Sequence, residues 1–302
     1  MSVNIEQVMI DKVYPFQVGG ARVLGRYAHL DNVITGVLEH HEYPWPVTRL
    51  LAELIVVGSL MVTGFKFKGV FTLQVVSKGP VRLLVLDITS DGNVRACAKF
   101  DETAVSKAQI DGNPLTTLIP GGNIVFSIDQ ENEKDIYQGI VEITGNNLSE
   151  CINHYFRQSE QINTTVMVAV PETESEFNNS NIQAGGIMIQ QMPEKPDQAG
   201  EEDDNTWLDA VTKMSTLKSS ELLDGSKQPE QMLYNLFWEE GVGVFEPKEL
   251  KAQCRCSMDK ITTMLQRFSE ADIKSMVVDG QVEVICEFCS KKYNLDPDTL
   301  LE

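Results

Sequence analysis

Residues 81–100 read VRLLVLDITSDGNVRACAKF, and this stretch decides the fold class. A nearly continuous apolar run at 81–88 is followed by the turn Asp91-Gly92-Asn93 and by a second strand-like run that ends at Phe100. Two such runs around a glycine-containing turn are typical of a β-hairpin. The sequence therefore predicts antiparallel strand pairing in the first half of the chain.

Further strands and helices flank this hairpin. Alternating or continuous apolar patterns predict strands at 22–26, 71–75, 124–128, 136–143, 164–170 and 186–192. Apolar residues at helical spacing predict helices at 33–38, at 47–55 and at 148–156. We expect residues 1–193 to form an N-terminal α+β domain, in which helices pack on a largely antiparallel sheet.

Chain length and net charge limit the expected number of domains and the kinds of partner. A chain of 302 residues exceeds the usual size of one core, so we expect more than one domain. The formal net charge of -19 repels phosphate groups, which argues against a nucleic-acid partner and against an anionic membrane surface.

The most apolar stretch, residues 50–62, is shorter than a membrane span of about 20 residues and contains Glu53, so we interpret it as a core helix. With no signal-peptide pattern at the start, the expected compartment is the cytoplasm.

The composition changes at Glu194. Residues 194–204 are rich in acidic side chains, which is typical of a solvated linker. Short amphipathic patches follow, the first around Trp207 and the last ending near Phe237. Because isolated helices of this length are marginal in water, they need a surface to pack against. We interpret residues 194–246 as a linker that is first acidic and then helical.

Residues 247–302 contain the main chemical signal, two tight cysteine pairs. Cys254 and Cys256 form a C-x-C pair, and Cys286 and Cys289 form a C-x-x-C pair. Four cysteine sulfurs suit a closed tetrahedral zinc site. The four histidines all lie outside this region, at His29, His40, His41 and His154. The sequence therefore predicts a small C-terminal domain that one zinc ion stabilises through four cysteines.

Spacing alone leaves alternatives open. A permanent structural zinc site is the commonest use of four cysteines. A thiol-disulfide oxidoreductase using Cys286 and Cys289 is a second interpretation, although the βαβ context of thioredoxin-like pairs is missing. A zinc-bearing regulator of nucleic acids would need a basic face. Cys97, in a strand pattern, and Cys151, on an apolar helix face, are interpreted as small buried side chains.

Several motifs resemble the thirty-three-kilodalton heat-shock protein family, which consists of redox-regulated holdase chaperones. They include the run 234–247 (YNLFWEEGVGVFEP), the C-x-C-S motif at 254–257, the C-x-x-C pair, the run 155–161 (YFRQSEQ) and the run 184–193 (AGGIMIQQMP). The resemblance extends over nearly the whole chain. It implies an ATP-independent chaperone that binds unfolding proteins and is not an enzyme.

The resemblance also implies a redox switch. In the reduced state all four cysteines of the C-terminal pairs would hold zinc, and the chaperone would be inactive. Oxidation would join Cys254 with Cys256 and Cys286 with Cys289, release the metal and unfold the small domain. Family members of this kind tend to form dimers when active. We expect residues 205–246 to rearrange or become disordered on oxidation, because their helices would lose a packing partner.

Overall fold

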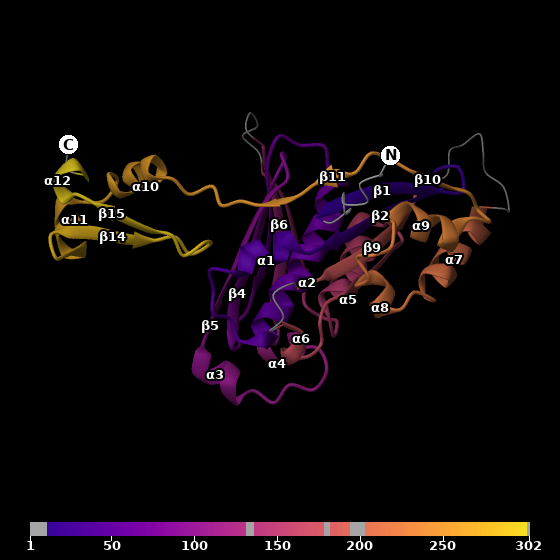
Figure 1. Ribbon diagram of the computed structural model, residues 1–302, viewed down its shortest axis with the longest axis horizontal. Coiled ribbons are helices and arrows are strands. Elements are labelled where there is room, and N and C mark those ends of the chain that lie inside the picture. Colours follow the sequence, from indigo (N-terminus) through magenta and orange to yellow (C-terminus); the bar gives the residue numbers. More distant parts are fainter. Residues whose placement is uncertain (1–10, 131–135, 178–181, 194–202, 301–302) are drawn as a thin grey trace, which may run out of the picture.

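The computed structural model describes residues 11–130, 136–177, 182–193 and 203–300. They form an N-terminal body built on two six-stranded sheets, a helical segment that packs on the body, and a small C-terminal unit (Figure 1). The predicted α+β class with antiparallel sheets is confirmed. Most of the acidic run that we interpreted as a linker, residues 194–202, lies outside the described residues.

The first sheet, called sheet A, has the strand order β10-β1-β2-β9-β8, with β11 also paired to β1. All its pairs are antiparallel. Its strands are β1 (Lys12–Val18), β2 (Val23–Leu30), β8 (Thr164–Ala169), β9 (Ala184–Gln191), β10 (Val242–Val244) and β11 (Lys248–Glu249). Strand β1 was not predicted, because Pro15 interrupts its pattern and proline is unusual inside a sheet.

The second sheet, called sheet B, has the order β12-β5-β4-β3-β6-β7. Its strands are β3 (Gly69–Val76), β4 (Val81–Thr89), β5 (Asn93–Phe100), β6 (Asn123–Gln130), β7 (Tyr137–Glu142) and β12 (Lys251–Ala252). The predicted hairpin is β4–β5, and its turn uses Gly92 at a φ of 84°. Only the short β12 runs parallel to its neighbour, β5.

Helix α2 (Trp45–Val62) forms the centre of the body, where it contacts strands of both sheets. It is long and apolar enough to cross a membrane, but 89% of it is buried inside the protein, which is the environment of a core helix. Glu53 is buried too, and it accepts a hydrogen bond of 2.8 Å from the Leu148 N–H. The remaining helices of the body are α1 (Asn32–Leu38), α3 (Glu102–Lys107), α4 (Leu115–Leu118), α5 (Leu148–Tyr155), a π-helical turn at Phe156–Glu160, and α6 (Glu174–Phe177).

Three helices cover the face of sheet A that points away from α2. They are α7 (Asp203–Met214), α8 (Ser219–Leu222) and α9 (Pro229–Phe237). Side chains of this outer face and of the three helices form a separate apolar cluster. In it the rings of Phe16 and Phe237 stack with centroids 5.7 Å apart. The linker helices thus have the packing partner that their length requires.

After α9 the chain returns to both sheets before it reaches the cysteines. Strands β10 and β11 pair with β1, and β12 pairs with β5. The C-terminal unit follows, with α10 (Met258–Leu265), α11 (Glu270–Met276), α12 (Pro297–Leu300) and a sheet of β13 (Val277–Val278), β14 (Gln281–Ile285) and β15 (Lys292–Leu295). Its apolar core is small, with Ile261, Leu265, Ile273, Val282, Tyr293, Leu295 and Leu300 buried. A unit of this size usually needs a metal or disulfides for stability.

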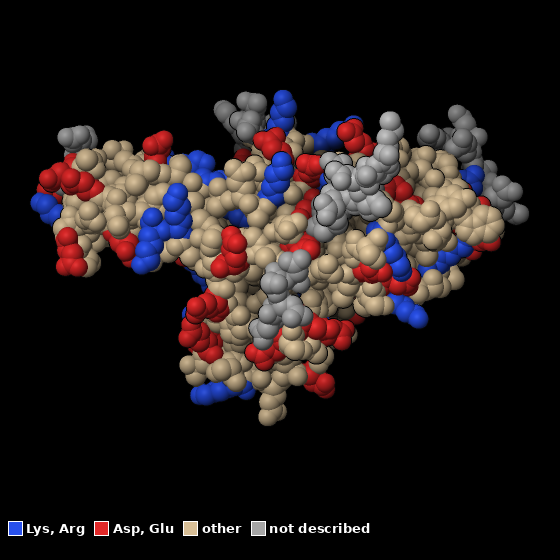
Figure 2. Space-filling view, in the orientation of Figure 1, with Lys and Arg blue, Asp and Glu red and all other residues tan. Residues whose placement is uncertain are grey.

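Charged side chains of both signs are scattered over the face visible in Figure 2, among larger areas of other residues. On the face shown in Figure 2, Lys and Arg side chains are interspersed with Asp and Glu side chains over the body and over the C-terminal unit. Over the whole sequence, 44 acidic residues outnumber 25 basic ones.

The contact between α9 and sheet A gives a first prediction. Replacing Phe237 by alanine should lower the free energy that holds α9 on the sheet by about 3–5 kcal/mol, because a fully buried ring is removed. Hydrogen exchange should accelerate in α7–α9 and stay slow in β3 and β4. The neighbouring Trp238 is 59% exposed, so Trp238→Ala is the matched control and should change that free energy by no more than about 0.5 kcal/mol. Equal exchange in the two variants would contradict the packing role of Phe237.

Candidate metal centre

Two short loops bring the four predicted cysteines together. The first knuckle, residues 254–256, starts two residues after β12, where the Gln253 N–H still donates to the Val94 carbonyl. It ends at Ser257, whose side chain caps α10 by accepting a hydrogen bond from the Lys260 N–H. The sheet edge and the capped helix therefore fix both ends of this knuckle.

The second knuckle, residues 286–289, is the turn between β14 and β15. The Cys286 N–H donates to the Lys291 carbonyl at 3.0 Å, and the Ser290 N–H donates back to the Cys286 carbonyl at 2.8 Å. Ser290 has a φ of 52°, which allows the chain to reverse tightly. The hairpin thus presents both of its cysteines on one side of a narrow turn.

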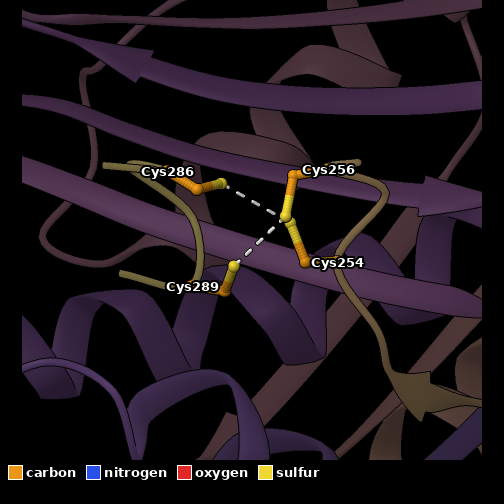
Figure 3. Close-up of side chains that lie close together, drawn as sticks. All are labelled: Cys254, Cys256, Cys286 and Cys289. Carbon is orange, nitrogen blue, oxygen red and sulfur yellow. Dashed lines mark hydrogen bonds between the residues drawn. The ribbon is translucent and has the colours of Figure 1, made fainter. Parts of the chain in front are cut away.

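The four sulfur atoms converge on one point (Figure 3). All lie within 4.8 Å of one another; Cys254 Sγ is 3.7 Å from Cys286 Sγ, and Cys256 Sγ is 3.5 Å from Cys289 Sγ. A tetrahedral zinc site with Zn–S bonds of about 2.3 Å separates its sulfurs by about 3.8 Å. The cluster therefore fits a single tetrahedral metal ion. Within the described ranges no second group of three or more metal-ligating side chains comes this close.

Hydrogen bonds from outside the four ligands orient the sulfurs. The Tyr293 hydroxyl donates to Cys256 Sγ at 3.1 Å from the adjacent strand β15. Cys254 Sγ accepts from the Cys256 amide, and Cys286 Sγ accepts from the amides of Phe288 and Cys289. Donors of this kind stabilise thiolates and fix their direction toward a metal. No sequence spacing marked Tyr293, because only the hairpin register brings it to the site.

The pKa values of the thiols reflect their crowding. Burial acts to raise the pKa of Cys254, but hydrogen bonds from the Cys256 amide and from the neighbouring thiols outweigh it and lower this pKa to about 7. Burial raises the pKa of Cys286 and of Cys289, and contacts with the other thiols add to the rise. Without a cation, then, the four thiols do not all ionise at neutral pH.

The remaining cysteines and histidines lie elsewhere. Cys97 on β5 and Cys151 on α5 are 2% and 0% exposed, which confirms that both are small buried side chains. Burial raises the pKa of Cys97 to about 12. His40 and His41 follow the end of α1, and neither joins the metal cluster. His41 instead contacts the backbone of the second knuckle, a role that sequence did not indicate.

Comparisons with known proteins decide the family. Residues 11–296 match the model of the family described as Hsp33 protein. The chain belongs to the Hsp33 family. It is 37% identical over 294 residues to a 33 kDa chaperonin of Caulobacter vibrioides, with 96% of each chain covered, and 34% identical over 276 residues to a 33 kDa chaperonin of Pseudomonas putida, with 91% of this chain and 87% of the relative covered.

The Hsp33 fold is also seen in a solved structure. The crystal structure of the 33 kDa chaperonin from Thermotoga maritima superposes with a TM-score of 0.78 at 21% identity, covering 96% of both chains. The Hsp33 family consists of chaperones and not of enzymes, which agrees with the expectation that this chain is not an enzyme. Family membership therefore argues against the interpretation of Cys286 and Cys289 as an oxidoreductase pair.

The crowded thiols predict a strongly pH-dependent metal affinity. Metal binding needs thiolates, and Cys286 and Cys289 have pKa values above those of ordinary thiols, so they carry protons that the metal must displace. Release of the protons of Cys286 and Cys289 alone means that affinity falls at least about hundredfold for each unit by which the pH is lowered near neutrality. Competition with a chromogenic chelator at several pH values measures this slope. Affinity that does not change with pH would contradict ligation by these thiols.

Proposed function

We propose that this chain is a redox-regulated, ATP-independent holdase that binds unfolding proteins and prevents their aggregation under oxidative stress. Membership of a chaperone family supports the binding of non-native proteins. The proposed redox regulation rests on one observation: the four clustered sulfurs, all within 4.8 Å of one another, come from cysteines, and the cluster includes no histidine or carboxylate. Because every member is a thiol, two disulfides are enough to remove the whole shell.

In the reduced state Cys254, Cys256, Cys286 and Cys289 hold one zinc ion. When bound, this ion keeps the four sulfurs as thiolates and contributes folding free energy to the C-terminal unit. Among the described residues of that unit, up to Leu300, only seven apolar side chains are buried in its core, which supports its dependence on the metal. The linker helices α7–α9 then lie on sheet A, and the chaperone is inactive.

Oxidation converts the four thiols to two disulfides, one joining Cys254 with Cys256 and the other joining Cys286 with Cys289. Each pair of thiols loses two electrons and two protons as its disulfide forms, and a peroxide or hypochlorite accepts the electrons. With hydrogen peroxide, two thiols and one peroxide yield one disulfide and two water molecules. Disulfide sulfurs no longer ligate the ion, so its folding free energy is lost and the C-terminal unit unfolds.

Loss of the C-terminal unit then releases the linker helices. The chain passes from α9 through the short strands β10–β12 to the first knuckle, so the linker and the metal unit share one continuous path. Release of α7–α9 uncovers the outer face of sheet A, which includes Tyr14, Phe16 and Ile187. This face, together with the apolar faces of the freed helices, would bind exposed apolar segments of clients.

Partners and location follow from the same proposal. Clients are unfolded or partly folded proteins, and a second copy of the chain can pair with the uncovered surface when the protein is oxidised. The net charge of -19 disfavours nucleic acid and anionic membranes as partners and keeps a protein with exposed apolar surface in solution. We place the protein in the reducing cytoplasm, where thiolates persist until an oxidant arrives.

The proposal is tested by light scattering of a client that unfolds on heating. The reduced, zinc-loaded chain should leave aggregation unchanged, and the peroxide-oxidised chain should suppress it at near-stoichiometric amounts. Replacing the four ligand cysteines by serine should abolish the response to oxidant, whereas Cys151→Ala should keep it. Equal suppression of client aggregation by the reduced and the oxidised wild-type chain would contradict redox regulation but not chaperone activity. Suppression by neither form would contradict the holdase proposal.

A disulfide map of the oxidised chain tests the pairing separately. In the reduced structure, sulfur contacts of 3.7 Å and 3.5 Å run between the knuckles, from Cys254 to Cys286 and from Cys256 to Cys289. We nevertheless expect bonds within each knuckle, because the first bond already removes two ligands and loosens the unit, after which sequence neighbours stay close while the knuckles separate. Peptide mapping by mass spectrometry distinguishes the two patterns. A majority of bonds between the knuckles would contradict unfolding of the unit on oxidation.

A further inference from the structure

The non-cysteine residues inside both knuckles all contact the N-terminal body. In the first knuckle, Arg255 Nη2 donates to Asp87 Oδ2 at 2.9 Å. In the second, the Lys99 ammonium pairs with the Glu287 carboxylate at 2.7 Å, and the guanidinium carbon of Arg95 lies 3.9 Å from the centroid of the Phe288 ring. The loops that carry the metal ligands are therefore seated on strands β4 and β5.

The receiving surface is the side of sheet B that points away from α2. Along β5 the residues Val94 and Ala96 point into the main core, so Arg95, Cys97 and Lys99 alternate onto the opposite side. We call the set Asp87, Arg95, Cys97 and Lys99 the docking face. In Figure 3 the cysteine cluster lies in front of the strands of the body, in agreement with these contacts.

The centre of the docking face is a buried ion network. Asp87 is 5% exposed, and its Oδ2 accepts hydrogen bonds from Arg95 Nε at 2.8 Å, from Arg95 Nη2 at 2.6 Å and from Arg255. Its other oxygen accepts from the Thr72 hydroxyl at 2.7 Å. Undocking would take Arg255 away from this buried carboxylate and leave it with Arg95 and Thr72 as partners. The network therefore favours the docked position of the first knuckle.

Arg95 also joins the two knuckles to each other. Its guanidinium interacts electrostatically with Cys254 of the first knuckle, shares Asp87 with Arg255 of the same knuckle, and stacks on Phe288 of the second. A further contact fixes the second knuckle: His41 Nε2 lies 3.1 Å from the Phe288 carbonyl, which can only accept. His41 Nδ1 is then the acceptor for the Ser290 hydroxyl, at 3.4 Å.

We propose that the docking face is a template that holds the two knuckles in metal-binding register, with Arg95, Asp87 and His41 as positioning residues. This inference rests on the proposed metal site. Docking and metal binding stabilise each other, because both require the same arrangement of the two loops and such coupling is reciprocal. The body thereby sets the metal affinity of the C-terminal unit and, through it, the ease with which oxidants reach the thiols.

The reactivity of the Cys97 thiol can report whether the second knuckle is docked. Cys97 lies on the docking face between Arg95 and Lys99, which contact Phe288 and Glu287 of the second knuckle, and it is 2% exposed. Departure of the second knuckle would therefore uncover it. Cys151 is equally buried but belongs to the main core near α2, so it serves as the internal control.

The test measures zinc affinity and Cys97 alkylation in the full-length reduced chain. Arg95→Ala and Phe288→Ala should each lower zinc affinity in a chelator competition by about 10- to 100-fold, the usual effect of removing an outer partner of a metal ligand. Both should accelerate alkylation of Cys97, read by mass spectrometry, and leave Cys151 protected. Arg95→Lys keeps the charge but loses the planar stack, so its affinity should lie between those of Arg95→Ala and the wild type.

The matched control is Arg82→Ala. Arg82 lies on β4 of the same sheet, pairs with Asp101 at 3.6 Å and has a side chain that is 68% exposed, so its loss should change neither readout. Wild-type zinc affinity in Phe288→Ala, with Cys97 still protected, would overturn the template. So would a loss of affinity while Cys97 stays protected, since docking would then be intact. Weakened zinc binding in a protein that suppresses no aggregation in any redox state would contradict the holdase proposal and support the template.

Discussion

The outer face of sheet A must be covered, and the rest of the architecture depends on this constraint. Strands β1, β2, β8 and β9 place apolar side chains on both of their faces, so one face packs on α2 and the other needs a second cover. Helices α7–α9 provide it, and they are too short to persist without it. Sheet and helices thus stabilise each other, and the contact is separable from the main core because it forms its own apolar cluster.

The path of the chain connects this cover to the cysteines. Residues 242–252 pair in turn with β1 and with β5, and Cys254, the first of the four clustered cysteines, follows. The knuckles then rest on the other sheet, through the network around Asp87. Residues 242–252, which pair with both sheets, therefore connect the four cysteines at one end to the linker helices at the other. Such a connection allows a local loss of ligands to affect a distant apolar face.

Local patterns predicted much of this structure. The hairpin around Gly92, the core helix at 45–62 and the four clustered cysteines were all predicted, since each depends on neighbours in sequence. Ser257 and Ser269 cap α10 and α11 through backbone N–H groups only three residues further on, so these contacts are local as well.

What the sequence did not predict depends on long-range pairing. Strand β1 was hidden by Pro15, and β10–β12 are too short to carry a pattern. The division into two sheets and the contact of Arg95 with Phe288 both depend on residues far apart in the chain. Such contacts leave no periodic pattern in a single sequence. Cys97 was correctly interpreted as buried, but its position beneath the second knuckle follows only from the fold.

The central claim is that oxidation of the cysteines uncovers the outer face of sheet A. A diazirine side chain in place of Met167, on β8 beneath the linker helices, tests it most directly, because it crosslinks whatever lies on that face. In the reduced chain we predict crosslinks within the chain, into residues 203–237, and in the oxidised chain crosslinks to an added unfolding client. Crosslinks that stay within 203–237 while the oxidised chain suppresses aggregation would contradict the account.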